Sequence, residues 1–264
     1  MRILFALWAA VLLHAADAPL YVFDNGLNRD VLSIEAQTEL AHKIGFAGLF
    51  YEKTTGIPQL VAAHQARGMH VLGIYTGMNL SDPKPGYDPS LPEAIRQLKG
   101  SGALITFTVN GKAANGDELA VPVIREVAVM AAQAGLKVAL YPHFGMYAAR
   151  VEDVLRLCEK AARPNLGIVF NLCHWLRSGD EANLATRLNA ALPHLLMISI
   201  NGADHEGDWN RLIQTLDRGA FDVKGFVATL RAMGYQGPIG LQCYAVPGDV
   251  EDNLTRSMKA WRSF

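Results

Sequence analysis

Two histidines and two carboxylic acids are the side chains of this sequence best suited to moving protons. His143 and His174 each follow a short apolar run, as do Glu52 and Asp24 nearer the start of the chain. An imidazole with an ordinary pKa of about 6.5 is a competent general base at neutral pH. We therefore predict that His143, His174 and Glu52 are catalytic. The alternative is that His143 only ends a strand and His174 only bonds a loop.

The ends of other apolar runs carry amides, hydroxyls and aromatic rings. Such neutral groups suit the hydroxyls and the apolar faces of a sugar, so the pattern favours a small-molecule sugar as the ligand. Trp209 is either a ring that stacks on the sugar or a packing residue. The candidate substrate-binding residues are Asp24, Asn110, Tyr141, Asn171, Asn201, Gln242 and Trp209.

One loop concentrates charge on the same side of the predicted fold. The segment 204–208 contains Asp204, His205, Glu206 and Asp208. Carboxylates and imidazoles so closely spaced could hold a metal ion or contact substrate. The alternative is an acidic loop that is simply solvated.

Eight strand-like runs alternate with helical patterns, and they must position these side chains. Glycines such as Gly45, Gly68, Gly135 and Gly234 stand where a helix would end before the next strand. The expected strands are 20–24, 46–51, 70–76, 103–109, 137–141, 167–171, 195–200 and 238–243. This alternation predicts an α/β fold, the (β/α)8 TIM barrel, which carries its chemistry at the C-terminal ends of its strands. A doubly wound open sheet is the alternative, but no Gly-x-Gly-x-x-Gly turn follows the first run.

Composition limits the function classes. The chain has 264 residues, 50% of them hydrophobic and 19% charged, with a formal net charge of -1. A full core is therefore possible, global disorder is excluded, and the absence of a basic excess argues against nucleic acid as a partner. The sequence contains no linker, so we predict a single barrel domain over 19–264. The oligomeric state stays open.

The first residues have the order of a signal peptide. Met1-Arg2 is followed by an apolar run over 3–13 and by small residues at 15, 16 and 18. We predict a signal peptide over 1–18, cut near 15–18, and export to the periplasm or the extracellular space. No membrane span is expected after its removal. The alternatives are a buried first strand or a tethering helix. Cys158, Cys173 and Cys243 are predicted to be packed thiols.

Residues from about 135 to 262 resemble the sugar phosphate isomerase/epimerase superfamily, which has the xylose isomerase-like or type 2 AP-endonuclease TIM barrel. The matching strings are 135–140 before Tyr-Pro-His, 163–174 with "Pro-Asn-Leu-Gly-Ile-Val-Phe" before His174, 198–204, and 234–242 with "Gly-Tyr-Gln-Gly-Pro-Ile". The resemblance implies a divalent metal held by Glu, Asp, His and Glu at the ends of strands 5 to 8, and two Glu that shuttle a proton through an enediolate. His174 and His143 match histidines of the family.

The sequence departs from that pattern at each implied ligand. Tyr141, Asn171, Ser199 and Gln242 stand at the four positions, so three carboxylates and one imidazole are missing. A hard divalent ion needs charged oxygens or imidazoles to compensate its charge. We therefore predict no metal and no other cofactor, with the inherited position empty or weak.

Three functions are compatible with these residues. The first is an isomerase, epimerase or related lyase that removes a proton next to a carbonyl of an unphosphorylated sugar or keto-sugar. The second is a carbohydrate-binding barrel without catalysis. The third, less favoured, is a glycoside hydrolase that uses Glu52 and Asp24 as its two carboxylates.

Overall fold

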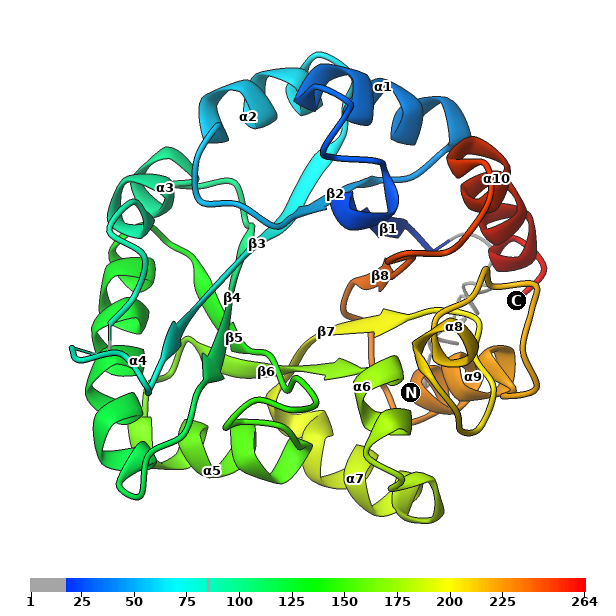
Figure 1. Cartoon of the computed structure of the whole chain (residues 1–264). Helices are drawn as coiled ribbons and strands as arrows, with labels where there is room; N and C mark the ends of the chain where they lie inside the picture. Colours follow the sequence, from blue (N-terminus) through cyan, green and yellow to red (C-terminus); the bar gives the residue numbers. More distant parts are fainter. Residues whose placement is uncertain (1–17, 85) are drawn as a thin grey trace, which may run out of the picture.

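The structure is a computed structural model that describes residues 18–84 and 86–264. Eight parallel strands pair in sequence order and close into a barrel, as Figure 1 shows. The strands are β1 Leu20–Phe23, β2 Gly48–Tyr51, β3 His70–Asn79, β4 Leu104–Asn110, β5 Lys137–Leu140, β6 Leu166–Asn171, β7 Leu195–Ile200 and β8 Ile239–Leu241. The predicted (β/α)8 TIM barrel is therefore confirmed. The predicted signal peptide lies outside the described residues, except for Ala18.

Helices surround the barrel and connect its strands (Figure 1). They are α1 Ile34–Ile44, α2 Ile57–Gln65, α3 Leu91–Gln97, α4 Gly116–Gln133, α5 Val151–Ala161, α6 Leu172–Arg177, α7 Leu184–Ala191, α8 Trp209–Leu212, α9 Val223–Ala232 and α10 Val250–Trp261. Asp222 and Asp249 cap α9 and α10 by accepting backbone N–H bonds, as their position before each helical pattern suggests. In the described part of the chain, no helix combines the length and apolarity needed to cross a membrane.

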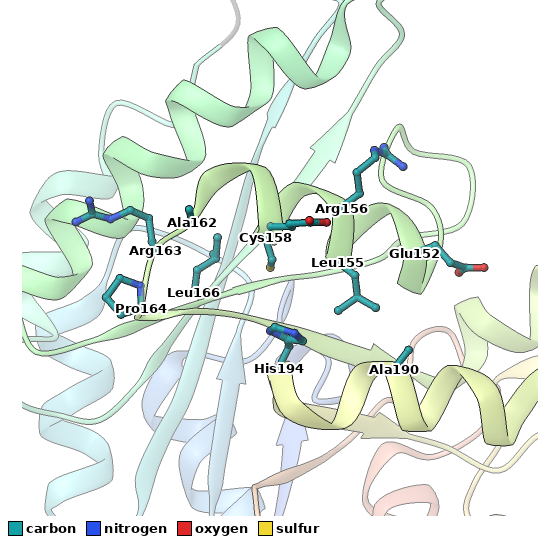
Figure 2. A pocket seen from close by; sticks show the side chains of 11 residues that line it. Glu152, Leu155, Arg156, Cys158, Ala162, Arg163, Pro164, Leu166, Ala190 and His194 are labelled. Atoms are coloured by element: carbon teal, nitrogen blue, oxygen red, sulfur yellow. The ribbon is translucent and has the colours of Figure 1, made fainter.

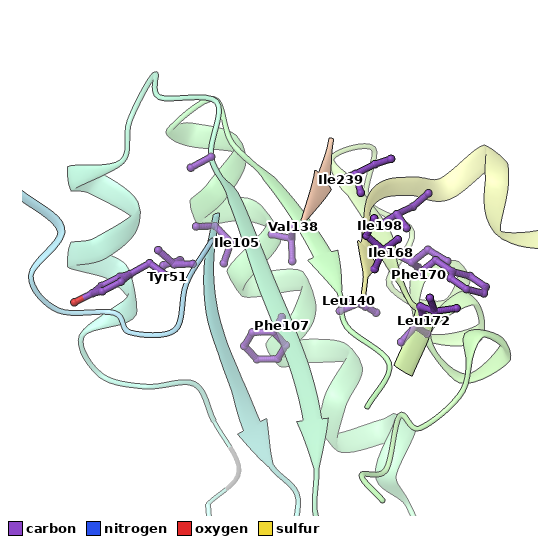
Figure 3. Close-up of a cluster of buried hydrophobic side chains, with 14 of the residues drawn as sticks. Tyr51, Ile105, Phe107, Val138, Leu140, Ile168, Phe170, Leu172, Ile198 and Ile239 are labelled. Atoms are coloured by element: carbon purple, nitrogen blue, oxygen red, sulfur yellow. The ribbon is translucent and has the colours of Figure 1, made fainter. Parts of the chain in front are cut away.

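The strands alternate between two environments because successive side chains point to opposite faces. One set faces outward and packs against the helices, as Ile105, Phe107, Ile168 and Phe170 do in Figure 3. The other set fills the barrel interior. Its members are Phe23, Phe50, Leu72, Leu104, Ala139, Tyr141, Val169 and Met197. Both faces are therefore buried, which explains the nearly continuous apolar runs in the sequence.

Most strand boundaries differ from expectation by one or two residues, and the largest differences are in β3 and β8. β3 continues to Asn79 because Gly77–Asn79 pair with Thr108–Asn110 of β4. A Cβ at Gly77 would lie 2.1 Å from Thr108 Oγ1, so only glycine allows this close pairing. β8 is shorter than expected and covers three residues, with both ends continuing as loop.

The three cysteines are buried free thiols, as predicted. Cys158 packs from α5, while Cys173 lies in α6 directly after β6. Burial raises the pKa of each thiol to about 12, so all three are neutral and act as small packing groups.

Candidate functional site

Four neutral polar side chains close the barrel interior at the C-terminal ends of β5 to β8. Three of them stand two residues beyond a residue of the inner layer, and Gln242 stands two beyond Gly240, where a Cβ would meet the inner-layer ring of Phe23, so the two-residue period points all four into the barrel. Tyr141 follows Ala139 in this way, and the others are Asn171, Ser199 and Gln242. All four are buried. They lie at the strand ends where the sequence places them and form the floor of the barrel mouth, while their contact with substrate stays a prediction.

Tyr141 is the centre of this floor. Its hydroxyl accepts a hydrogen bond from Asn171 Nδ2, and its ring meets the ring of Tyr75 edge-on at 5.3 Å between centroids. Burial raises the pKa of Tyr141 well above its usual value, so the hydroxyl keeps its proton. Because the Asn171 amide donates to the Tyr141 oxygen, the Tyr141 hydroxyl acts as the acceptor in that bond. Its own proton is therefore free to be donated to another group.

Two other atoms of the floor lack partners. Ser199 Oγ and Gln242 Oε1 are buried without a hydrogen bond, although Ser199 lies close enough to Tyr141 to lower its pKa slightly. A buried polar group without a partner costs about 1–3 kcal/mol. These atoms therefore mark a place where ligand hydroxyls would be stabilised.

The floor does not fit a divalent cation. Its side chains are neutral, and Asn171 already uses Oδ1 to accept from the His174 N–H and Cys173 Sγ–H. Its Nδ2 is a donor that points toward Tyr141, where a metal would require an acceptor. Within residues 18–84 and 86–264, no three His, Cys, Asp or Glu side chains come together as metal ligands.

His143 and His174 meet above this floor. Their ring centroids are 3.8 Å apart, and the rings are tilted by 39°. Burial lowers the pKa of both, and the charge of His143 lowers that of His174 further. His143 Nδ1 lies 3.0 Å from the carbonyl of Phe144, so it carries the proton and leaves Nε2 as a free base. His174 Nδ1 is buried without a partner.

The carboxylates predicted from β1 and β2 lie together on the other side of the mouth. Arg29 Nη1 donates to Asp24 Oδ1 at 3.2 Å and also to Glu52 Oε2. Glu52 Oε1 accepts from Asn25 Nδ2, and the Glu52 N–H donates to Asp24 Oδ2 at 3.1 Å. Burial lowers the pKa of His143, and the negative charge of Glu52 offsets part of this lowering, so the two groups lie within electrostatic reach of each other.

Asp24 is fully buried, which predicts an unusual dependence of stability on pH. Burial, and next the charge of Glu52, raise its pKa to about 6. Between about pH 4, the unfolded value, and pH 6, the folded state holds the extra proton, so raising the pH through this window favours unfolding. We expect Asp24→Asn to gain about 2–3 kcal/mol relative to wild type between pH 4 and pH 7.

Urea unfolding of both proteins at pH 4, 5.5 and 7 measures this difference. A difference that stays constant with pH would show that folding does not change the pKa of Asp24.

A cavity of about 770 Å³ adjoins Glu52 on the side of β3 and β4. Tyr75, Thr108 and Asn110 line it together with Glu52, so it contains the predicted substrate residue Asn110. Asn110 is exposed at the end of β4. Met78, Asp82 and Tyr87 also line the cavity, so it lies between the strand ends and the chain that follows β3.

Asn201 and the acidic loop hold the chain after β7 in place. Asn201 Nδ2 donates to the carbonyls of Gly202 at 2.8 Å and Leu212 at 2.6 Å. Asp204 accepts from Arg211 Nε at 2.8 Å, and His205 pairs with Glu181. These contacts are structural, and contact of Asn201 with substrate stays a prediction.

Trp209, the remaining predicted residue, lies on the rim of the mouth. Its ring meets that of His174 edge-on, with 5.3 Å between centroids, and is partly exposed. It therefore lies beside the candidate bases and does not belong to the core.

Three residues of the mouth were not singled out from the sequence. Arg29 lies in the loop after β1, and Phe144 directly follows His143. Arg177 is one turn beyond His174 on α6. The spacing of Arg177 was a usable signal, because residues three apart share a helix face.

A second groove, of about 820 Å³, lies between α5 and α7 on the outside of the barrel (Figure 2). Leu155, Leu166, Ala190 and His194 line part of it. Glu152 near the start of α5 and Arg163 just beyond its end both line it, so the groove runs along the outside of this helix.

Comparison with known proteins agrees with this architecture. A family model described as a xylose isomerase-like TIM barrel matches residues 38–264. No protein of curated function matches the chain in sequence.

Solved structures give the same fold at low sequence identity. The 3-keto-D-glucoside 4-epimerase of E. coli is 16% identical, with a TM-score of 0.72 over 94% of this chain and 99% of that one. The D-allulose 3-epimerase of Methylomonas sp. is 14% identical, with a TM-score of 0.72 over 92% and 95%. The probable 3-DHS dehydratase of Bacillus anthracis is 14% identical, with a TM-score of 0.73 over 91% and 97%.

Proposed function

Because the chain belongs to the xylose isomerase-like TIM-barrel family, we propose that it is a sugar isomerase or epimerase. Its substrate is an unphosphorylated sugar or keto-sugar, and the reaction removes a proton next to the carbonyl. Two similar structures are described as sugar epimerases, which supports this class. The arginine of the inner mouth, Arg29, is occupied by Asp24 and Glu52, so it does not offer a phosphate site.

The observation that carries the proposal is the neutral His143–His174 pair facing Glu52 across the mouth. Two imidazoles in contact resist protonation, because a positive charge on one disfavours a charge on the other. His143 follows β5 and Glu52 follows β2, three strands apart around the barrel. A sugar between them would therefore meet a base on each face.

The proton transfers follow from this placement. His143 Nε2 takes the proton from the carbon, and the electron pair moves onto the carbonyl oxygen to form an enediolate. The Tyr141 hydroxyl donates a hydrogen bond to that oxygen as its negative charge develops. Inversion requires a proton delivered to the same carbon from the opposite face; solvent water on the Glu52 side supplies it, and His143 releases the proton that it took to solvent. Isomerisation instead returns the His143 proton to the neighbouring carbon, and the hydroxyl proton of that carbon moves to the oxygen of the former carbonyl.

The carboxylate arrangement disfavours the glycoside hydrolase. Such enzymes place two carboxyl groups on opposite sides of the scissile bond, about 5 to 9 Å apart. Asp24 and Glu52 instead share one nitrogen of Arg29 and the same side of the mouth. The carbohydrate-binding barrel without catalysis remains the alternative, and turnover distinguishes it from an enzyme.

We also propose that the protein is exported, because residues 1–18 show a basic start, then an apolar run, then small residues, in the order of a signal peptide.

Exchange with solvent deuterium tests the proposal. Purified protein is incubated in D2O with D-allulose, D-fructose, D-tagatose and 3-keto-D-glucose, and each recovered sugar is analysed by NMR. We expect deuterium at the carbon next to the carbonyl of at least one sugar, with an epimer or isomer of it. Binding without exchange across the panel would favour the non-catalytic barrel.

A further inference from the structure

Exposed aromatic side chains gather on the loops around the barrel mouth. Within the described residues, the large apolar side chains that are exposed are Val31, Phe144, Trp209 and Tyr244. Each follows the C-terminal end of a strand, after β1, β5, β7 and β8. Of these four, Phe144 and Trp209 are in contact, and a contiguous exposed apolar patch with a polar rim marks a site of interaction, whereas single exposed apolar residues such as Val31 and Tyr244 are ordinary.

Phe144 and Trp209 form one continuous surface, which we call the aromatic shelf. Their ring centroids are 6.1 Å apart, with the rings nearly perpendicular. The guanidinium carbon of Arg177 lies 5.5 Å from the centroid of Phe144 and 5.6 Å from that of Trp209. This cation contacts both rings and leaves each of them 38% exposed.

The shelf is fixed in place before any ligand binds. Arg177 Nη1 donates to the Gly207 carbonyl at 2.6 Å, which ties α6 to the loop before Trp209. That loop is held in turn by Asp204, which accepts from Arg211 Nε and the Ala220 N–H. A ligand that stacks here therefore does not have to order the rings first.

The shelf also adjoins the proposed bases. Trp209 contacts His174, and His174 contacts His143, so the shelf begins one ring beyond the place where the proton is removed. Polar groups border it, because Arg177 and the exposed carboxylate of Asp208 lie 3.6 Å apart beside Trp209. An apolar ring face with charged groups at its edge matches a pyranose, which presents C–H groups on its faces and hydroxyls at its rim.

We infer that the aromatic shelf binds the second sugar ring of a disaccharide whose first ring reacts at His143. The inference rests on the proposed function, since that function places the reacting ring between His143 and Glu52. The substrate class is then a glycoside of two sugar rings, in place of a free monosaccharide.

Matched pairs of one-ring and two-ring sugars test this assignment by calorimetry and saturation-transfer NMR. The pairs are methyl β-D-glucoside with cellobiose, methyl α-D-glucoside with maltose, and methyl β-D-galactoside with lactose. In at least one pair we expect the disaccharide to bind about tenfold more tightly than the methyl glycoside, because its second sugar ring stacks on an aromatic ring of the shelf. Trp209→Ala should abolish that gain, whereas Trp209→Phe should retain most of it.

Tyr244→Ala is the matched control, because it removes another exposed aromatic ring of the same face outside the shelf. It should leave the ratio of affinities unchanged. Equal affinity within every pair, or a ratio that Trp209→Ala does not change, overturns the inference. The same holds if Trp209→Ala instead converts a dimer into a monomer. Failure of all six sugars to bind also overturns it, and the deuterium exchange described above then shows whether the proposed function fails as well.

Discussion

Replacement of His143 by alanine is expected to lower the rate of deuterium incorporation by about 10²- to 10⁴-fold, the usual contribution of a positioned general base. The ring of His143 has its Nδ1 occupied by the Phe144 carbonyl and its Nε2 free. No other neutral base of this kind faces the mouth in the described residues except its neighbour His174, whose Nδ1 is buried without a partner. The rate is measured by NMR on whichever sugar of the panel exchanges.

The dependence of the rate on pH gives a second readout. Burial lowers the pKa of His143 from its usual 6.5, so the base stays unprotonated below neutral pH. We therefore expect kcat/KM to remain high as the pH falls through 6.5 and to decline only below that value. The alanine variant should lose this decline. His42→Ala, on the exposed face of α1, is the matched control and should keep the wild-type rate. Wild-type exchange by His143→Ala would place the base elsewhere.

The sequence was sufficient for the fold because both strand faces are buried. Interior residues such as Val169 and outward residues such as Ile168 are both apolar, so each strand appears as a continuous run between helical patterns. The glycines that end helices add a second signal. Gly45, for example, has φ of 100°, which glycine adopts without strain. Strand ends were less certain, since pairing with a neighbour decides where a strand such as β3 stops.

The floor of the mouth was also predictable, and for a geometric reason. Tyr141 directly follows β5 and Asn171 is the last residue of β6, and both face inward, so the neighbouring strands bring the two side chains into contact. Asn201 shows the limit of this reasoning. It also follows a strand end, yet its amide donates to the carbonyl of Leu212 at the end of α8, a contact that depends on how the chain after β7 folds back.

Loop residues of the site could not be derived from strand ends. Arg29 bridges two carboxylates from different strands, and nothing within its own segment indicates that Glu52 will lie beside it. The aromatic shelf depends likewise on three separate segments, after β5, β6 and β7. In the sequence, the apolar residues of such loops look the same as residues that pack in the core. Only their exposure in the folded chain distinguishes a surface for binding from a packing residue.

Tyr141→Phe tests whether a hydroxyl stabilises the negative oxygen in this barrel. The substitution keeps the ring packed against Tyr75 and removes one oxygen. Loss of a single donor to a developing oxyanion costs about 10²- to 10³-fold in kcat. We expect a decrease of that size with little change in KM, because the hydrogen bond strengthens only as charge forms on the oxygen.

The variant will also be less stable, which requires a control. Asn171 Nδ2 loses its acceptor and remains buried, so the free energy of unfolding should fall by about 1–3 kcal/mol. Tyr235→Phe removes another buried hydroxyl, which donates to the Pro238 carbonyl at the opposite end of the barrel. It should show a comparable loss of stability in urea without the loss of kcat. Equal kcat in the two variants would mean that the Tyr141 hydroxyl only supports the floor, and that the charge on the enediolate is stabilised by other groups.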